Sequence, residues 1–416
     1  MDLSAFHALL TPAGQEALRA AEALAPREVD FLPDLTALSR RFPLELSRSA
    51  LEIAILRREA AAKYPFAEKL YFTRPALEQA TSYPVSTYRA ERLSGFSYVL
   101  DLGCSVGGDT LALVGAGLHV TGVDLDPLRL AMAQANLQAL GWHSGRGVFV
   151  QADLRAALPL SFDGRQAIFF DPARRESSGS GRRAFSVRHY QPPLESVLGW
   201  LPHCPAVAVK ISPGVDLAEL GGLLRGPQAA PEVEFISLAG ELKESVLWFG
   251  PLASAPRRAT LLSRDPAGQG GVVRHTLPGT PDDASGSEPL PLSEPQATLY
   301  EPDPAVLRSG LVGLLGWQLA AAQLDPDIAY LTSDRLQPTP FARSWAVEAW
   351  FPFSLKRLRS ALRERHVGRV TVKKRGSPLE PQQLIRELRL QGSQERVVFL
   401  THLQGRPIAI LAYPGG

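Results

Sequence analysis

The stretch Ser97-Tyr98-Val99-Leu100-Asp101-Leu102-Gly103-Cys104-Ser105-Val106-Gly107-Gly108-Asp109 decides the fold of this chain. Its first half predicts a buried strand, which breaks into a glycine-rich turn and continues as a helix from about Asp109. A turn from strand into helix needs a positive φ angle or a close backbone approach, and glycine supplies both. Asp101 ends the apolar strand, where a carboxylate is costly to bury without a partner. A ligand that is cationic or donates hydrogen bonds would provide that partner.

The glycines of this turn do not form the dinucleotide-binding fingerprint, which requires G-x-G-x-x-G. Asp101, Gly103 and Gly107 instead form D-x-G-x-S-x-G. This pattern resembles motif I of class I S-adenosylmethionine-dependent methyltransferases, with Ser105 in place of the usual middle glycine. The resemblance implies that Asp101, Gly103 and Gly107 hold the methionine end of S-adenosylmethionine and that Ser105 belongs to the same site. The alternative is a glycine-rich turn that binds no ligand.

Three later apolar strands are also predicted to end in an acid: residues 120–124 at Asp124, 148–153 at Asp153 and 167–171 at Asp171. Alternating strands and helices form a doubly wound sheet, in which the carboxyl ends of parallel strands meet at one crevice. Any one of these acids could cap a helix instead, but four such caps in succession are not expected. The pattern therefore predicts one ligand site at this edge of the sheet.

The acids after the second and third strands are expected to bind the adenosine part of the cofactor. A carboxylate at the end of the second strand can bind both ribose hydroxyls, which gives Asp124 that role. The resemblance assigns Asp153 to the exocyclic amine of adenine. It also places Leu125 and Leu154, which directly follow the two acids, in the cofactor pocket.

Asp171-Pro172-Ala173-Arg174 occupies the position of motif IV, where the family often carries Asp or Asn, two prolines and an aromatic residue. The resemblance makes Asp171 and Pro172 the catalytic pair that faces the methyl acceptor. A carboxylate there suits an exocyclic amine, because it accepts N–H bonds and stabilises positive charge on the nitrogen. The aromatic platform is missing, so a ring nitrogen or a 2′-hydroxyl stays open as the acceptor. Tyr190 or Phe72 could supply the stacking ring instead.

Two basic segments are candidates for contact with a phosphate backbone. The first is the loop after motif IV with Arg182 and Arg183, beside which Arg174 of motif IV lies. This segment is either a solvated loop or a lid that grips phosphate. Residues 353–396 hold twelve basic and four acidic side chains in a chain whose net charge is only +2. This local excess is typical of a nucleic-acid footprint, with a solvated basic helix face as the alternative. The run Lys373-Lys374-Arg375 follows a predicted strand and is the expected contact.

Four segments are predicted: an N-terminal helical domain (1–93), an S-adenosylmethionine-binding methyltransferase domain (94–263), a hairpin and linker (264–298) and an α/β domain (299–416). In the last, a single helix is expected over residues 305–322. The order of its helices and strands resembles the THUMP-like domain of bacterial methyltransferases, and THUMP domains proper bind RNA. The expected class is therefore α/β: a Rossmann-like class I methyltransferase sheet, an N-terminal helical domain and a small C-terminal α/β THUMP-like domain. A more distant similarity is to the cap-guanine N2 methyltransferases.

The composition is that of an ordinary soluble protein, with 45% hydrophobic residues and 44 basic against 42 acidic side chains. Cys104 and Cys204 lie far apart, which argues against a disulfide framework or a zinc site and suits a reducing cytoplasm. No signal peptide is evident, and the most apolar helical run, residues 311–322, is too short to span a bilayer. We therefore expect a cytoplasmic protein with no metal and no membrane partner.

The sequence predicts a methyltransferase that acts on RNA, with a base nitrogen of tRNA or rRNA as the favoured acceptor. Two alternatives stay open. One is a non-catalytic RNA-binding protein that retains the cofactor pocket. The other is a small-molecule methyltransferase, which would leave the C-terminal charge unexplained.

Overall fold

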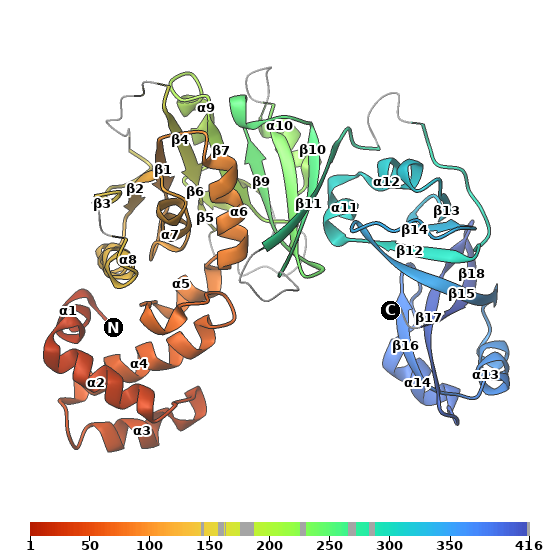
Figure 1. Cartoon of the computed structure of the whole chain (residues 1–416), viewed down its shortest axis with the longest axis horizontal. Coiled ribbons are helices and arrows are strands. Elements are labelled where there is room, and N and C mark those ends of the chain that lie inside the picture. The colour runs from red at the N-terminus through yellow and green to blue at the C-terminus, as the bar shows by residue number, and fades with distance from the viewer. Residues whose placement is uncertain are drawn as a thin grey trace. The chain divides into compact units, whose positions relative to one another are not determined.

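The computed structural model describes residues 1–142, 145–156, 162, 164–174, 187–224, 230–264, 272–282 and 288–413, without the side chains of Arg174 and Arg264. The chain separates into two compact units. Figure 1 shows the whole chain, coloured by residue number from red at the N-terminus to blue at the C-terminus. Unit 1 comprises Met1–Pro231 and Ser245–Ser254, and unit 2 comprises Glu232–Glu244 and Ala255–Gly416. Unit 1 thus combines the expected N-terminal helical domain with most of the expected methyltransferase domain, while the strands from residue 232 onward largely belong to unit 2.

Unit 1 begins with helices, as the sequence predicts. They are α1 (Leu3–Leu10), α2 (Pro12–Ala23), α3 (Phe31–Leu38), α4 (Leu44–Ala60), α5 (Arg74–Gln79) and α6 (Tyr83–Leu93). Helix α2 starts at a proline, and the Thr11 hydroxyl accepts the Gly14 N–H at 3.2 Å, which is a typical N-terminal cap. Helix α4 is buried along most of its length and forms the centre of this helical part.

The rest of unit 1 is built on a parallel sheet in the order β7-β4-β1-β2-β3. Its strands are β1 (Tyr98–Leu102), β2 (His119–Asp124), β3 (Gly147–Gln151), β4 (Gln166–Phe170) and β7 (Val207–Ile211). The last residues of β9 (Glu241–Trp248) run antiparallel beside β7. The connecting helices are α7 (Gly108–Gly115), α8 (Pro127–Ala139), α9 (Ser196–Trp200) and α10 (Leu217–Leu223), and β5 (Ala173–Arg174) pairs with β6 (Tyr190–Gln191). The predicted Rossmann-like sheet is therefore confirmed.

Unit 2 contains β8 (Glu232–Leu238) in parallel with β10 (Arg257–Arg264), which forms an antiparallel hairpin with β11 (Val272–Gly279). Its larger sheet has the order β13-β14-β12-β15-β18-β17-β16. These strands are β12 (Thr298–Pro302), β13 (Ala322–Asp325), β14 (Ile328–Ser333), β15 (Ala342–Pro352), β16 (Val367–Lys374), β17 (Gln394–Leu403) and β18 (Arg406–Ala412). Helices α13 (Leu355–Glu364) and α14 (Pro381–Leu388) pack their apolar side chains onto one face of this sheet.

The prediction of a single helix over residues 305–322 is wrong. The structure has two short helices, α11 (Pro304–Ser309) and α12 (Val312–Gln318), because Gly310 ends α11 with φ at 70°. A left-handed glycine is a common helix terminator, and the apolar periodicity that runs through it does not show the break.

Candidate active site

The four acids expected at one edge of the sheet lie at, or within two residues of, the carboxyl ends of β1, β2, β3 and β4: Asp101, Asp124, Asp153 and Asp171. In the register of these strands, Asp101 stands beside Gly122 on β2 and Phe169 on β4. The backbone N–H of Gly103 donates to Val123 at 2.8 Å, and the N–H of Asp171 donates to Leu102 at 2.9 Å. The glycine-rich turn is therefore fastened between the ends of two neighbouring strands.

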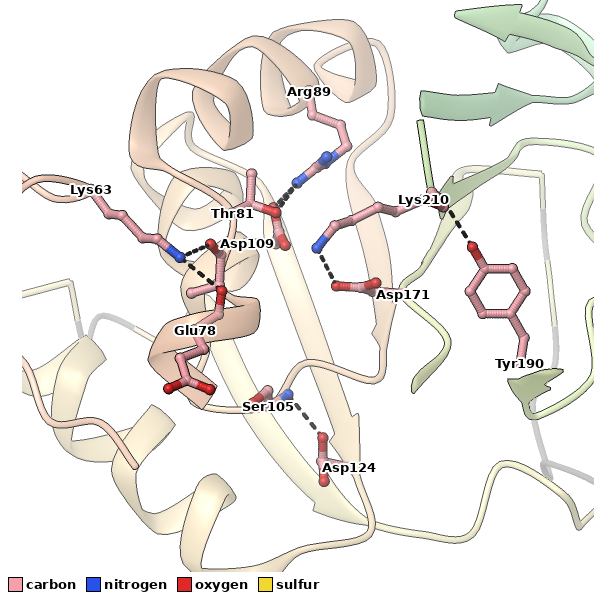
Figure 2. A network of polar contacts seen from close by, with 12 residues as sticks. Lys63, Glu78, Thr81, Arg89, Ser105, Asp109, Asp124, Asp171, Tyr190 and Lys210 are labelled. Atoms are coloured by element: carbon pink, nitrogen blue, oxygen red, sulfur yellow. Dashed lines mark hydrogen bonds and ion pairs between the residues drawn. The ribbon is translucent and has the colours of Figure 1, made fainter. Parts of the chain in front are cut away.

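Three residues of this turn adopt positive φ angles: Gly103 at 87°, Ser105 at 50° and Gly107 at 84°. A Cβ atom at Gly103 would overlap the carbonyl oxygen of Asp171, so only glycine fits there. Ser105 tolerates its left-handed conformation while its backbone N–H donates to Asp124 Oδ2 at 2.9 Å, as Figure 2 shows. The serine that replaces the usual glycine therefore keeps the turn in contact with the end of β2.

Asp101 is buried, with 1% of its surface exposed. Its Oδ2 accepts the Thr110 hydroxyl, whereas its Oδ1 has no hydrogen-bond partner in the part of the chain that the structure describes. Burial raises the pKa of Asp101 to about 8, with a further contribution from the negative charge of Asp109. An orphaned buried acceptor of this kind fits a ligand that brings an ammonium group.

A buried arginine lies behind the turn and was not singled out by the sequence. Arg89, on α6, is 1% exposed, forms an ion pair with Asp109 at the start of α7, and stacks over the Phe169 ring at 4.5 Å. Its guanidinium also donates to the Thr81 hydroxyl at 3.3 Å (Figure 2). Helix periodicity indicates only that Arg89 is helical, so no local signal identifies this long-range pair.

The segment before α6 is held against the same turn. Lys63 Nζ donates to the carbonyl oxygens of Leu77, Glu78 and Ala80 at 2.7, 3.0 and 2.9 Å. The hydroxyl of Tyr64, next along the chain, donates to the Thr81 carbonyl at 2.9 Å. The Tyr64 hydroxyl also lies where a Cβ atom at Gly108 would stand, and Arg89 pairs with Asp109, so this segment reaches the turn through these two contacts.

Asp171 is paired with a residue to which the sequence assigned no role. Lys210 Nζ, on β7, lies 2.7 Å from Asp171 Oδ2, and the two side chains are 15% and 29% exposed (Figure 2). The available signal was a lysine within an otherwise apolar strand that directly neighbours β4. Pro172 is buried, and the chain continues into β5, where Ala173 pairs with Gln191.

The residues expected around adenosine differ in their surroundings. Asp124 Oδ1 accepts the Asp126 N–H at 2.9 Å, so each of its oxygens already accepts one backbone donor. Arg155 holds the Asp153 carboxylate through Nε at 2.9 Å and Nη2 at 2.6 Å, and these bonds lower the pKa of Asp153 to about 2. Leu125 is 57% exposed, and Leu154 is half-buried.

Neither aromatic residue suggested as a stacking platform presents its ring to a ligand. Phe72 is 1% exposed and packs against Tyr64 with ring centroids 5.6 Å apart. Tyr190 is 4% exposed, and its hydroxyl accepts the Ser212 N–H at 2.7 Å. Both rings serve the core, which corrects the suggestion that they replace the motif IV aromatic. Among the loop arginines, Arg182 and Arg183 lie outside the described residues, and only the backbone of Arg174 is described.

The C-terminal basic run is already engaged within unit 2. Lys373 forms an ion pair with Glu301, and Lys374 Nζ lies 2.6 Å from Glu380. Arg375 stacks over the Tyr330 ring at 5.0 Å and lines a pocket of about 610 Å³. Two of the three cations are thus neutralised by carboxylates, which weakens their expected role as the main phosphate contacts.

Cys104 and Cys204 are buried free thiols. The described ranges hold no group of three side chains arranged to bind a metal ion. Among those residues, no helix is long and apolar enough to cross a membrane.

Comparison with known proteins identifies three parts of the chain and a relative that covers most of it. Residues 99–170 match the methyltransferase domain family, 342–414 match the THUMP domain-like family, and 2–60 match a domain of unknown function, DUF8688. An uncharacterized S-adenosylmethionine-dependent methyltransferase of Mycobacterium tuberculosis (strain H37Rv) is 38% identical over 362 residues, which are 85% of this chain and 92% of that protein. The chain belongs to the S-adenosylmethionine-dependent methyltransferases.

Two further similarities extend this assignment. The methyltransferase is 29% identical to the trimethylguanosine synthase of Schizosaccharomyces pombe over 103 residues, which are 24% of this chain and 43% of that enzyme. The crystal structure of a proposed methyltransferase from Porphyromonas gingivalis W83 covers 97% of this chain and 98% of its own, with a TM-score of 0.76 and 21% identity. That likeness shows a shared fold along nearly the whole length.

S-adenosylmethionine is the cofactor of this methyltransferase, and the residues of the site fit it. The cofactor carries an α-ammonium group, for which the unpaired Oδ1 of Asp101 is a suitable acceptor. The close approach of Gly103 to Asp171 places the glycine-rich turn directly beside the residue expected to face the acceptor. The resemblance to class I methyltransferases with a THUMP-like domain is therefore confirmed.

Proposed function

We propose that this methyltransferase acts on RNA and methylates a nitrogen of a base, with Asp171 facing that nitrogen. The observation that carries the proposal is the position of the Asp171 carboxylate, which adjoins the Gly103 turn and is held through one oxygen by Lys210 at 2.7 Å. The THUMP domain-like match and the similarity to a trimethylguanosine synthase support RNA as the substrate class.

The cofactor supplies an electrophilic methyl group on a sulfonium sulfur. Asp101 Oδ1 would accept hydrogen bonds from its ammonium group, and the turn of Gly103, Ser105 and Gly107 would lie along its methionine part. Asp124 retains acceptor capacity for the ribose hydroxyls, because a carboxylate has about four lone-pair sites and two are used. Asp153 would accept a hydrogen bond from the exocyclic amine of adenine, and Leu125 and Leu154 would line the same part of the pocket.

The chain's own contribution to transfer is positioning and a fixed electric field. Asp171 Oδ1, which has no partner among the described residues, can accept an N–H of an exocyclic amine, while Lys210 holds Oδ2. As the nitrogen takes up the methyl group, the bond of that group to sulfur would break and the sulfur would keep the electron pair. The Asp171 carboxylate would favour the positive charge that develops on the nitrogen and would accept the proton that the nitrogen then loses. Pro172 is buried beside it and keeps the backbone of this edge rigid.

Nucleoside mass spectrometry tests this proposal. RNA from cells with and without the protein is digested to nucleosides, and a methylated base that disappears with the protein names the acceptor atom. If the nucleoside that disappears is instead 2′-O-methylated, the acceptor is a ribose hydroxyl and not a base nitrogen. An unchanged set of nucleosides, together with no transfer of labelled methyl groups to RNA in vitro, would leave the cofactor site without an RNA substrate.

A further inference from the structure

We propose that the outer side of helices α13 and α14 is the surface on which the phosphate backbone of RNA docks. This inference rests on the proposed function and concerns the partner of unit 2. It assigns the contact with phosphate to cations other than Lys373, Lys374 and Arg375, which the sequence predicted for that role. The surface, called here the helical basic face, is defined by Lys356, Arg363, Arg386 and Arg389.

Nine of the twelve basic residues of the 353–396 segment fall into two groups, those held in ion pairs and those of the helical basic face. Of the other three, Arg357 stacks over the Phe351 ring, Arg359 donates to the Glu387 carbonyl oxygen and Arg375 stacks over the Tyr330 ring. Five are held in ion pairs with carboxylates of unit 2: Arg365 and Arg396 with Glu348, Arg369 with Glu395, Lys373 with Glu301, and Lys374 with Glu380. Three of these pairs involve side chains no more than 28% exposed. A phosphate could recruit such a cation only by displacing its carboxylate, so these residues add little to polyanion binding.

The helical basic face behaves differently. All four of its residues are exposed, and none forms an ion pair with any residue that the structure describes. Lys356 and Arg363 are seven residues apart on α13, which is two turns and places them on one side of the helix. Arg386 and Arg389 lie in the last turn and at the C-terminal cap of α14. Apart from Arg375, the cations of the segment that form no ion pair with a described residue lie on these two helices or at the cap of α14.

These helices form one continuous support. Arg359 Nη2, on α13, donates to the carbonyl oxygen of Glu387 near the end of α14 at 2.6 Å. The apolar sides of both helices share one core with the sheet, through Leu358 and Leu362 on α13 and Leu384 and Leu388 on α14. The opposite, charged side is therefore held rigidly toward solvent, which lowers the entropy cost of binding an extended ligand.

The charges on α13 and α14 favour RNA as the ligand of the helical basic face. Of the acids on the two helices, Glu364 accepts the Ser360 hydroxyl and Glu387 accepts the Gln383 amide, each at 2.9 Å. Unpaired, exposed Lys and Arg side chains gain most from phosphates, because each contact releases condensed counterions from the nucleic acid. Four exposed cations on two packed helices suit a chain of phosphates rather than a single anion, and the RNA of the proposed function supplies such a chain.

The test compares two variants with equal loss of charge. The first carries Lys356→Ala, Arg363→Ala, Arg386→Ala and Arg389→Ala. The matched control carries Arg19→Ala, Arg40→Ala, Lys69→Ala and Arg146→Ala, four exposed cations of unit 1 that form no ion pair with a described residue. Binding of a fluorescein-labelled structured RNA transcript of tRNA size is followed by anisotropy at several salt concentrations. Calorimetry with S-adenosylhomocysteine and the melting temperature verify that each full-length variant is folded.

The first variant is expected to lower the slope of log K against log salt by about three, at 0.7–0.9 per lost contact, and to weaken binding on the order of 100-fold at 0.1 M salt. The control is expected to keep the wild-type slope. Equal slopes for the first variant and wild type, or equal losses in the two variants, would overturn the proposed surface. Preferential loss of binding to vesicles of phosphatidylserine, with RNA binding retained, would assign the face to a membrane instead.

The same measurements separate this inference from the proposed function. If the wild type binds RNA through the helical basic face but transfers no methyl group to it, the proposed surface is supported and the proposed RNA methyltransferase activity is contradicted. If the wild type methylates RNA and the first variant does so with unchanged KM and kcat, the proposed activity is supported and the proposed surface is contradicted. The expected result is a raised KM for RNA with kcat unchanged, because the lost contacts bind substrate and transition state equally.

Discussion

Lys210 Nζ and Asp171 Oδ2 lie 2.7 Å apart at the carboxyl edge of the parallel sheet, on the neighbouring strand β7 and directly after β4. The pair is partly buried, with side-chain exposures of 15% and 29%. One carboxylate oxygen is thereby fixed in orientation, and the other remains to meet an acceptor. A positioned carboxylate with one oxygen to spare is the central element of the proposed transfer site.

Replacement of Lys210 tests whether the pair positions Asp171. Lys210→Met should lower kcat for RNA methylation by about 10- to 100-fold, because the carboxylate loses the partner that orients it. Lys210→Arg should restore part of the rate, while the affinity for S-adenosylhomocysteine stays within a few-fold in both variants. A methionine variant with wild-type kcat would show that the ion pair has no part in transfer.

The affinity for the cofactor should depend on pH through Asp101. With its pKa at about 8, Asp101 is protonated and neutral at pH 6 to 7 in the cofactor-free protein. Pairing with an ammonium group requires the carboxylate, so binding releases a proton and strengthens as the pH rises toward 8, by at most about tenfold per pH unit. Calorimetry from pH 6 to 8.5, in buffers of different ionisation enthalpy, measures both effects.

Asp101→Asn is the matched control, since it preserves the shape of the side chain and removes the titration. Its cofactor affinity should be weak and independent of pH over the same range. A wild-type affinity that does not change between pH 6 and 8.5 would contradict the proposed contact with the ammonium group.

The same substitution should stabilise the cofactor-free protein. The folded-state pKa of Asp101, about 8, exceeds its ordinary value of 3.8, so the folded state binds more protons between these values. Asp101 therefore makes folding less favourable as the pH rises from about 4 to 8. Asp101→Asn should raise the melting temperature by ~2–4 °C at pH 8 and leave it nearly unchanged at pH 4. A lower melting temperature at pH 8 would contradict the account of Asp101 as an unpaired buried acid.

Asp124 should account for much of the affinity for the ribose. Asp124→Ala removes two charge-assisted hydrogen bonds and is expected to cost roughly 2–4 kcal/mol in binding S-adenosylhomocysteine. Asp126→Ala is the control, because Asp126 caps α8 through the Leu128 N–H at 2.9 Å and has no assigned contact with the cofactor. Equal affinities of the two variants in calorimetry would remove the ribose role from Asp124.

Local patterns were sufficient to predict the parallel sheet, the glycine-rich turn and the acids at the strand ends. The β1–α7 turn needs glycine at 103 and 107, and this requirement is visible in the residues themselves. The partners of the charged residues were not predictable in the same way. Lys210 with Asp171, Arg89 with Asp109 and Lys373 with Glu301 join side chains 39, 20 and 72 positions apart.

The basic C-terminal segment shows the same limit. Its charge could be counted from the sequence, but the division into paired and unpaired cations depends on tertiary contacts. Buried aromatic residues such as Phe72 and Tyr190 likewise follow from packing that composition cannot resolve. The sequence therefore identifies the cofactor site better than the substrate surface.

The central claim is tested most directly by transfer of a labelled methyl group from S-adenosylmethionine to RNA, with the wild type compared with Asp171→Ala. The wild type should place the label on a base nitrogen of the digested RNA. Asp171→Ala should bind S-adenosylhomocysteine within a few-fold of wild type, and its rate of methyl transfer should be lower by about 100-fold or more. Transfer by Asp171→Ala at the wild-type rate would contradict the account.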